Sequence, residues 1–165
     1  MSCSLRPVGR AHRARLEELT RATGRFREEE VATAVELLEE SLEGNDDYRF
    51  VGAFEEERLV GYACWGPTPG TAGTHDLYWI VVDEGRQGAG IGTQLLVEIE
   101  HGLRANGQRL VVVETSSRSD YAPTRAFYEK RGFTRAATIP AYYAPGDDLV
   151  IYTKDLTDGM ARAPS

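Results

Sequence analysis

The sequence has 165 residues, with 19 Lys and Arg against 26 Asp and Glu and a formal charge of −7. A chain of this length is a usual size for one domain and can bury a core without covalent staples. The acidic balance argues against a broad phosphate-binding face for nucleic acid. Cys3 and Cys64 are too few for a disulfide framework or a cysteine-based metal site.

These limits predict a single domain over 1–165, with a core of about 4–156 and a tail at 157–165, and no metal. The stretch "MSCSLRPVGRAHRARLEELT" lacks an apolar run of signal-peptide length. No later segment approaches the roughly 20 apolar residues of a membrane span. We therefore expect a cytoplasmic protein without a membrane or nucleic-acid partner.

The first half of the chain predicts one strand, two helices and a hairpin. A short strand at 4–8 leads into a helix at 11–22. The stretch 27–44 has apolar residues at helical spacing and predicts a second helix. Two β-rich runs within 48–65, broken by the charged tip 55–58, indicate an antiparallel hairpin.

The second half alternates strands and helices. We expect, in chain order, a strand at 76–82, a helix at 90–106, a strand at 109–115, a helix at 123–131, and strands at 134–139 and 149–153. The strands at 76–82 and 109–115 are apolar at both alternating sets of positions, which is typical of strands covered on both faces. The order of elements indicates the α/β class.

A glycine-rich turn, "VVDEGRQGAGIGTQLL" at 81–96, joins the first of these strands to the following helix. The start of a helix presents N–H groups without acceptors, and its dipole favours negative charge. Glycine lets a ligand approach the backbone closely. The turn therefore indicates a phosphate or pyrophosphate site, and the alternative is a tight turn whose glycines serve geometry alone.

Two common phosphate motifs do not fit this turn. A P-loop needs Gly-Lys-Ser/Thr, and here Gly92 is followed by Thr93 without a lysine. The dinucleotide fingerprint needs a third glycine after Gly88 and Gly90, and Thr93 stands there, although Glu114 mimics its ribose-binding acid.

The pattern that fits is Q/R-x-x-G-x-G/A, present as "QGAGIG" at 87–92, and in this the chain resembles the GNAT family of N-acetyltransferases. The stretch "TRAFYEKRGF" at 124–133 is similar to the late helix of that family, and the order of elements agrees over most of the chain. The resemblance implies a single-domain fold with a mixed central sheet flanked by helices on both faces. It also implies transfer of an acetyl group from acetyl-CoA to a primary amine by direct attack on the thioester.

The resemblance assigns the coenzyme to the turn and to the strand before it. Backbone near Val82 would pair with the pantetheine arm, and Arg125 would meet a phosphate or serve only as a solubilising charge. The strand at 76–82 spans about 20 Å, which is enough for an extended arm. The residues implied at the pyrophosphate are Gln87, Gly88, Ala89, Gly90, Ile91, Gly92 and Thr93.

Candidate catalytic residues lie on three predicted elements. Tyr128 occupies the position of the tyrosine that protonates the leaving thiolate in many relatives, or it is a core aromatic. Asp76 stands where some relatives carry a general base, or it is a solvated strand end, and Glu114 is the rival base. His75 is a weaker candidate that we interpret as a loop histidine.

The remaining candidate residues do not identify the acceptor amine. Tyr121 stands where many relatives carry an asparagine that contacts the coenzyme. Tyr142 and Tyr143 line the acceptor pocket or pack within the final hairpin. We expect a small-molecule or peptide amine that is cationic in solution, and a homodimer is possible. A non-catalytic acyl-CoA sensor and an interaction protein that has lost its ligand are the alternatives.

Overall fold

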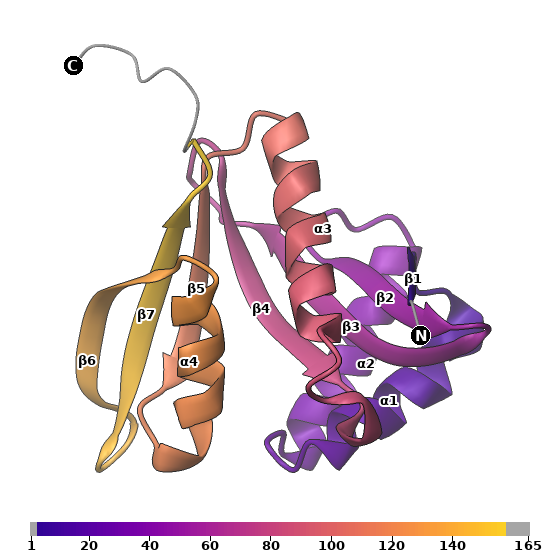
Figure 1. The fold of residues 1–165 in the computed structure, drawn as a ribbon, viewed down its shortest axis with the longest axis horizontal. Coiled ribbons are helices and arrows are strands. Elements are labelled where there is room, and N and C mark those ends of the chain that lie inside the picture. The colour runs from indigo at the N-terminus through magenta and orange to yellow at the C-terminus, as the bar shows by residue number, and fades with distance from the viewer. Residues whose placement is uncertain (1–2, 158–165) are drawn as a thin grey trace. The chain divides into compact units, whose positions relative to one another are not determined.

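The computed structural model describes residues 3–157. In this part of the chain seven strands form one mixed sheet in the order β1-β2-β3-β4-β5-β7-β6, with four α-helices (Figure 1). This confirms the predicted α/β fold. Of the predicted tail, 158–165 lie outside the described residues. Two compact units can be distinguished among the described residues: unit 1 is 3–67 with 78–102, and unit 2 is 68–77 with 103–157.

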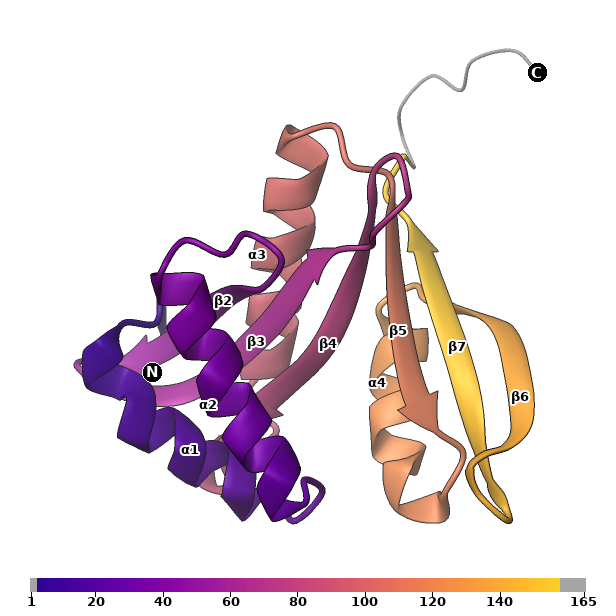
Figure 2. The same cartoon turned by 180° about the vertical axis from the view of Figure 1, so that it is seen from behind.

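Unit 1 has helices on both faces of its strands. Helices α1 and α2 cover one face of β2, β3 and β4, and α3 covers the other (Figures 1 and 2). Its elements are β1 (Ser4–Arg6), α1 (Arg13–Ala22), α2 (Glu28–Leu42), β2 (Arg49–Glu55), β3 (Arg58–Pro67), the later part of β4 (Thr74–Val82) and most of α3 (Ile91–Ala105).

The predicted hairpin and both early helices are confirmed. Strands β2 and β3 pair antiparallel, from Arg49 with Trp65 to Glu55 with Arg58. A short 3-10 helix, Arg10–His12, precedes α1, so the predicted helix is divided near its start. The core under α1 and α2 is an apolar cluster of Val8, Leu16, Leu19, Val35, Leu38, Phe54, Leu59, Tyr62 and Val81.

Helix α3 lies close to β3 because Gly61 has no side chain. A Cβ added there would stand 3.1 Å from Ile91 Cγ2 and 3.1 Å from the backbone oxygen of Val81. Contacts this short displace neighbours in a packed interior. Gly61 therefore sets the depth at which α3, and with it the start of the glycine turn, rests on the sheet.

Unit 2 has antiparallel strands with α4 on one face. Strand β7 lies between β5 and β6, and the first part of β4 pairs parallel with β5 through Thr74–Asp76. The elements after α3 are β5 (Leu110–Ser116), a 3-10 helix (Ser119–Tyr121), α4 (Ala122–Lys130), β6 (Thr134–Ala144) and β7 (Asp147–Asp155).

Three expectations about the strands were wrong. On β5, Val111 and Val113 are buried, but Glu114 on the other face is exposed. On β4, Tyr78 is 37% exposed, so this strand is also not covered throughout. Strand β6 continues to Ala144, well past the predicted end at 139, because its pairing with β7 resumes at the turn.

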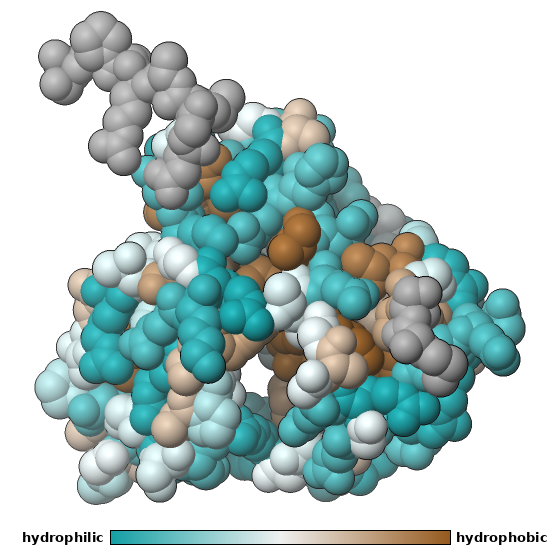
Figure 3. Space-filling model, viewed as in Figure 1, coloured by the Kyte–Doolittle hydropathy of each residue, from teal (hydrophilic) through white to brown (hydrophobic). Residues whose placement is uncertain are grey.

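Hydrophilic residues predominate on the face shown in Figure 3. None of the helices in 3–157 is long and apolar enough to cross a membrane.

Candidate functional site

The glycine turn begins at a well-anchored residue, Asp83, directly after β4. Its backbone N–H donates to the Val60 oxygen at 2.8 Å, and its Oδ1 accepts from the Gly85 N–H at 3.1 Å. The Gly85 N–H, followed by the Arg15 guanidinium, lowers the pKa of Asp83 below its ordinary value. A short 3-10 helix, Glu84–Arg86, then leads into the turn.

Two glycines of the turn adopt a conformation that other residues avoid. Gly88 has φ 84° and Gly90 has φ 82°, in the left-handed region. Apart from the glycine itself and its two chain neighbours, no heavy atom lies within 4 Å of the place where either Cβ would be. Turn geometry thus favours glycine at both positions, and the backbone there is open to an approaching ligand.

Not every predicted N–H group of the turn is equally available. The Ala89 N–H donates to the Arg86 oxygen at 3.3 Å, and the Gln87 N–H donates to the Glu84 oxygen at 3.5 Å. Helix α3 begins at Ile91, and the first N–H groups of a helix have no acceptor within it. The strongest donors for an anion are therefore at the start of α3, in the segment 90–92.

Val82 ends β4 beside a small hollow of about 180 Å³ between that strand and α1. Arg15 lines the hollow and makes three hydrogen bonds: it donates to the Leu59 oxygen at 3.0 Å, to Glu18 Oε1 at 3.0 Å and to Asp83 Oδ2 at 2.7 Å. The arginine therefore braces the strand end at which the pantetheine contact is predicted.

The two candidate bases share one face of the strands of unit 2. Asp76 on β4 pairs with Val112 on β5, and Glu114 is two residues further along β5. Paired residues and alternate residues lie on the same face, with the two Cα atoms about 8 Å apart by strand geometry. Asp76 is half-buried and its Oδ2 accepts a hydrogen bond of 2.8 Å from Thr68 Oγ1, whereas Glu114 is exposed.

The candidate acid lies on the opposite face. Tyr128 is 5% exposed, and its ring centroid is 5.2 Å from that of Phe133 and 6.5 Å from that of Tyr152. Tyr152 pairs with Val113, whose side chain points away from the face of Glu114. Burial raises the pKa of Tyr128 above that of a free tyrosine. Its phenol is therefore protonated throughout the neutral range.

Arg125 holds the connection between β5 and α4. Its Nη1 donates to the Ser116 oxygen at 2.7 Å and to the Arg118 oxygen at 2.8 Å. Its predicted phosphate contact would thus come from the remaining N–H groups. The Arg118 guanidinium binds the Asp120 carboxylate and lies 5.2 Å from the ring of Tyr121, the residue that stands in place of the usual asparagine.

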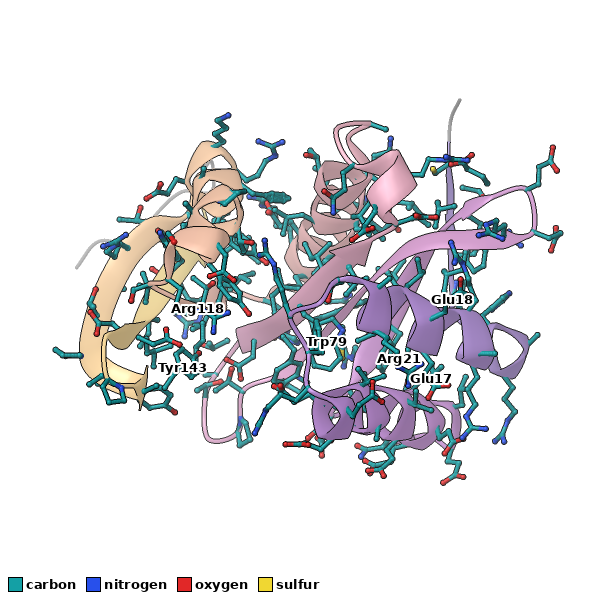
Figure 4. The ribbon with its side chains drawn as sticks, turned by 90° about the horizontal axis from the view of Figure 1, so that it is seen from below. Glu17, Glu18, Arg21, Trp79, Arg118 and Tyr143 are labelled. Atoms are coloured by element: carbon teal, nitrogen blue, oxygen red, sulfur yellow. The ribbon has the colours of Figure 1, made fainter. Side chains whose placement is uncertain are left out.

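Tyr142 and Tyr143 lie near the end of β6 and are 55% and 47% exposed. Their ring centroids are 5.0 Å apart with nearly perpendicular planes. The pKa of Tyr143 is raised to about 12, first by partial burial and then by the negative charge of Glu114. Figure 4 shows Tyr143 in unit 2 with Arg118. Glu114 is thus a neighbour of this aromatic pair.

The sequence interpretation placed His75 in a loop, and this was wrong. It lies within β4, pairs with Val111 and is 4% exposed. Its side chain is on the face opposite Asp76, because successive strand residues alternate.

Sequence reasoning missed a set of aromatic rings in unit 1: Phe26, Tyr48, Tyr78 and Trp79. These residues come from three segments that are far apart in the chain, so no local spacing marks them. The adjacent pair Tyr78-Trp79, in a strand expected to be covered on both faces, was the only signal available.

Comparison with a protein-family sequence model and with a solved structure indicates the same family. The sequence model of the Acetyltransferase (GNAT) family matches residues 13–133. A protein from Desulfovibrio desulfuricans, described as a GNAT-family acetyltransferase, has 42% identity and a TM-score of 0.91, covering 94% of this chain and 99% of its own. A comparison with curated proteins found no match.

Two more distant structures share the fold. The ribosomal-protein-S18-alanine N-acetyltransferase of Escherichia coli has 16% identity and a TM-score of 0.79, with 99% of each chain covered. The YncA protein of Salmonella typhimurium, solved with its cofactor acetyl-CoA, has 21% identity and a TM-score of 0.76, covering 100% of this chain and 99% of its own.

Proposed function

Because this chain belongs to the Acetyltransferase (GNAT) family, we propose that it transfers the acetyl group of acetyl-CoA to a primary amine of a small molecule or peptide. The observation that carries the proposal is the turn at 87–93, where left-handed glycines leave the backbone open at the start of α3. The acetyl-CoA complex of the Salmonella protein of the same fold supports the choice of coenzyme.

Coenzyme binding follows from the chemistry of the turn. The pyrophosphate would accept hydrogen bonds from N–H groups at the start of α3, where the helix dipole also favours negative charge. Gly88 and Gly90 have no side chain beyond hydrogen, so phosphate oxygens can reach the backbone. The pantetheine arm would pair with backbone near Val82, and Arg125 would offer its remaining N–H groups to a phosphate.

The reaction is an acyl transfer between two heteroatoms. A neutral amine nitrogen attacks the thioester carbon, the C–S bond breaks, the new nitrogen centre loses a proton and the thiolate gains one. Asp76 or Glu114 would take the proton, directly or through water. Tyr128 would donate a hydrogen bond and then its proton to the departing sulfur.

The candidate acid and the candidate bases lie on opposite faces of the strands, and this restricts where the thioester can bind. Asp76 and Glu114 lie on one face of the strands of unit 2, and Tyr128 lies on the other. One thioester can meet both kinds of group only if its carbonyl carbon lies at the level of the sheet. The amine would then enter from the carboxylate face, and the sulfur would leave toward the face of α4.

The test is release of the CoA thiol from acetyl-CoA in the presence of a panel of primary amines, with hydrolysis in the absence of amine as the background. The proposal expects amine-dependent release and an acetylated product of matching mass. Calorimetric titration with CoA separates the alternatives: tight binding without turnover of any amine would indicate a non-catalytic sensor. Absence of CoA binding would overturn the proposal altogether.

A further inference from the structure

Ala141 has a backbone conformation that only one other non-glycine residue shares within 3–157. Its φ is 52°, and that of Glu56 is 55°. Glu56 lies in the two-residue turn between β2 and β3, where the favoured hairpin turns require a positive φ. Ala141 lies inside β6, where no such turn explains it. A left-handed backbone is strained for a residue with a Cβ, and such strain persists only where surrounding contacts hold it.

The strained residue belongs to a wide bulge of β6. The pairing of β6 with β7 stops after Ile139 and resumes at Ala144, and in between the four residues 140–143 face only Asp148. A bulge of this kind changes the direction of side chains that would otherwise alternate strictly. Strand β6 is an edge of the sheet, and Pro140 together with a bulge is enough to keep another strand from pairing there. Protection of the edge therefore does not account for the left-handed backbone.

Asp148 holds the bulge in place. Its Oδ1 accepts a hydrogen bond of 2.8 Å from the Ala141 N–H, and the carboxylate charge strengthens this bond. On the backbone, the Asp148 N–H donates to Ser117 Oγ at 2.8 Å, and the Asp148 oxygen accepts from the Ser117 N–H at 2.9 Å. Ser117 directly follows β5, where Arg125 fixes the connection through the Ser116 oxygen. Asp148 thus ties Ala141 to a well-anchored part of unit 2.

The bulge brings Tyr143 to the carboxylate of Glu114. Strand β7 lies between β5 and β6, and neighbouring strands are about 4.8 Å apart, so the backbones of β5 and β6 are about 10 Å apart. The long side chains of Tyr143 and Glu114 together bridge this gap, since Glu114 is the first charged group that raises the pKa of Tyr143. Tyr143 is also 47% exposed, so its ring is open to a ligand at this carboxylate.

We infer that Asp148 is a positioning residue of the acceptor site. By holding Ala141 in its left-handed conformation, it keeps Tyr143 beside Glu114. The inference rests on the proposed acetyltransferase function, in which the amine enters from the face of Asp76 and Glu114. Tyr143 contacts the acceptor there, whereas Asp148 acts only through Tyr143. Without the hydrogen bond, Ala141 relaxes to an ordinary strand conformation and the Tyr143 ring leaves the carboxylate.

Two replacements of Asp148 separate its hydrogen bond from its charge. Asp148→Asn removes the charge but keeps an oxygen that can accept from the Ala141 N–H, and Asp148→Ala removes both. The probe is the amine of the panel that gives the fastest thiol release. Its KM should be about 5- to 30-fold higher in Asp148→Ala than in Asp148→Asn, the factor that corresponds to the cost of a left-handed backbone. The kcat and the affinity for CoA should change little, and equal KM values for the amine would overturn the inference.

A double-mutant cycle shows whether Asp148 acts through Tyr143. Tyr143→Ala should raise the KM for the amine at least as much as Asp148→Ala does, and the double variant should be little worse than Tyr143→Ala alone. Asp155→Ala, which removes an aspartate at the other end of β7, is the control and should keep the wild-type KM. Additive effects of the two replacements would show that Asp148 acts on the fold in general, and would overturn the inference.

Amide hydrogen exchange of the free protein tests the contact without any turnover. Ala141 is exposed, so its hydrogen bond to Asp148 is what protects its N–H from exchange. This N–H should exchange about 5-fold faster or more in Asp148→Ala than in Asp148→Asn. Equal exchange rates would overturn the inference even if amines are turned over. The expected difference in exchange, without thiol release for any amine of the panel, would instead reject the proposed enzyme reaction and with it the acceptor role of Tyr143.

Discussion

Arg15 and Asp83 join helix α1 to the end of strand β4, with the Arg15 Nη2 atom 2.7 Å from Asp83 Oδ2. Asp83 is the residue from which the glycine turn departs, and its side chain also caps the Gly85 N–H. The salt bridge therefore fixes the starting point of the proposed phosphate site from the opposite face of the sheet, without contacting the site itself.

Asp83→Asn should lower the free energy of unfolding at neutral pH by about 1 kcal/mol, since the pair is partly exposed. The lowered pKa of Asp83 gives stability that is fully present above the unfolded-state pKa near 4 and is lost as pH falls through the folded-state value. The difference between variant and wild type in urea unfolding should thus shrink below about pH 4. If the difference in free energy of unfolding between variant and wild type stays constant with pH, a charge effect is rejected.

Gly90→Asp should weaken CoA binding strongly while the domain stays folded. The new carboxylate would face the pyrophosphate, at a position where no heavy atom lies within 4 Å. Gly90→Asn is the matched control, because Asn and Asp have the same shape and both tolerate positive φ. Calorimetric titration of both variants with CoA isolates the effect of the added charge on affinity. Equal affinities for CoA in the two variants would contradict an anion at this turn.

Tyr128→Phe should lower kcat about 100-fold or more, in the range of general-acid effects. Because burial raises the pKa of Tyr128, the phenol stays protonated, and the defect should be nearly independent of pH below about 9. The ring packing against Phe133 and Tyr152 is kept in the variant. Thermal unfolding should therefore change little, and full activity would reassign Tyr128 to the core alone.

Asp76→Asn should reduce turnover most at low pH, where little free amine exists, and less as pH approaches the pKa of the amine. Glu114→Gln is the natural comparison, because both carboxylates lie on the same face of unit 2. If Asp76 is the base, pH–rate profiles should show this defect for Asp76→Asn and not for Glu114→Gln. The reverse pattern would move the base to Glu114, beside Tyr143.

Gly61→Val should destabilise the protein by about 1–3 kcal/mol, because its side chain would press on Ile91 and the Val81 backbone beneath α3. Gly102→Ala is a control within α3 itself, since no heavy atom beyond the helix backbone lies within 4 Å of the added Cβ. Alanine is the better helix former by about 1 kcal/mol. Denaturant unfolding should therefore show a lower free energy of unfolding than wild type for Gly61→Val and a higher one for Gly102→Ala.

Local patterns were enough for much of the fold. Residue spacing predicted the two early helices, the hairpin with its tip at 55–58 and the turn before α3, because periodicity and glycine preferences depend on a few neighbouring residues. The glycines at 88 and 90 adopt a left-handed backbone, which a tight turn of this kind allows them to do. Membership of the GNAT family was also readable from two short motifs and their order, as the match over 13–133 confirms.

Only the tertiary structure decided which faces of the strands are covered and which side chains meet. A valine-rich strand such as β5 is typical of burial on both faces, yet Glu114 is exposed, because α4 packs against the other face. His75 and Asp76 are neighbours in sequence, but they point to opposite faces. Ring contacts join Phe26 to Trp79 and Tyr48 to Tyr78, from segments with no common spacing. Such contacts depend on strand register and helix packing, which arise from the whole chain and leave no mark in a short stretch of sequence.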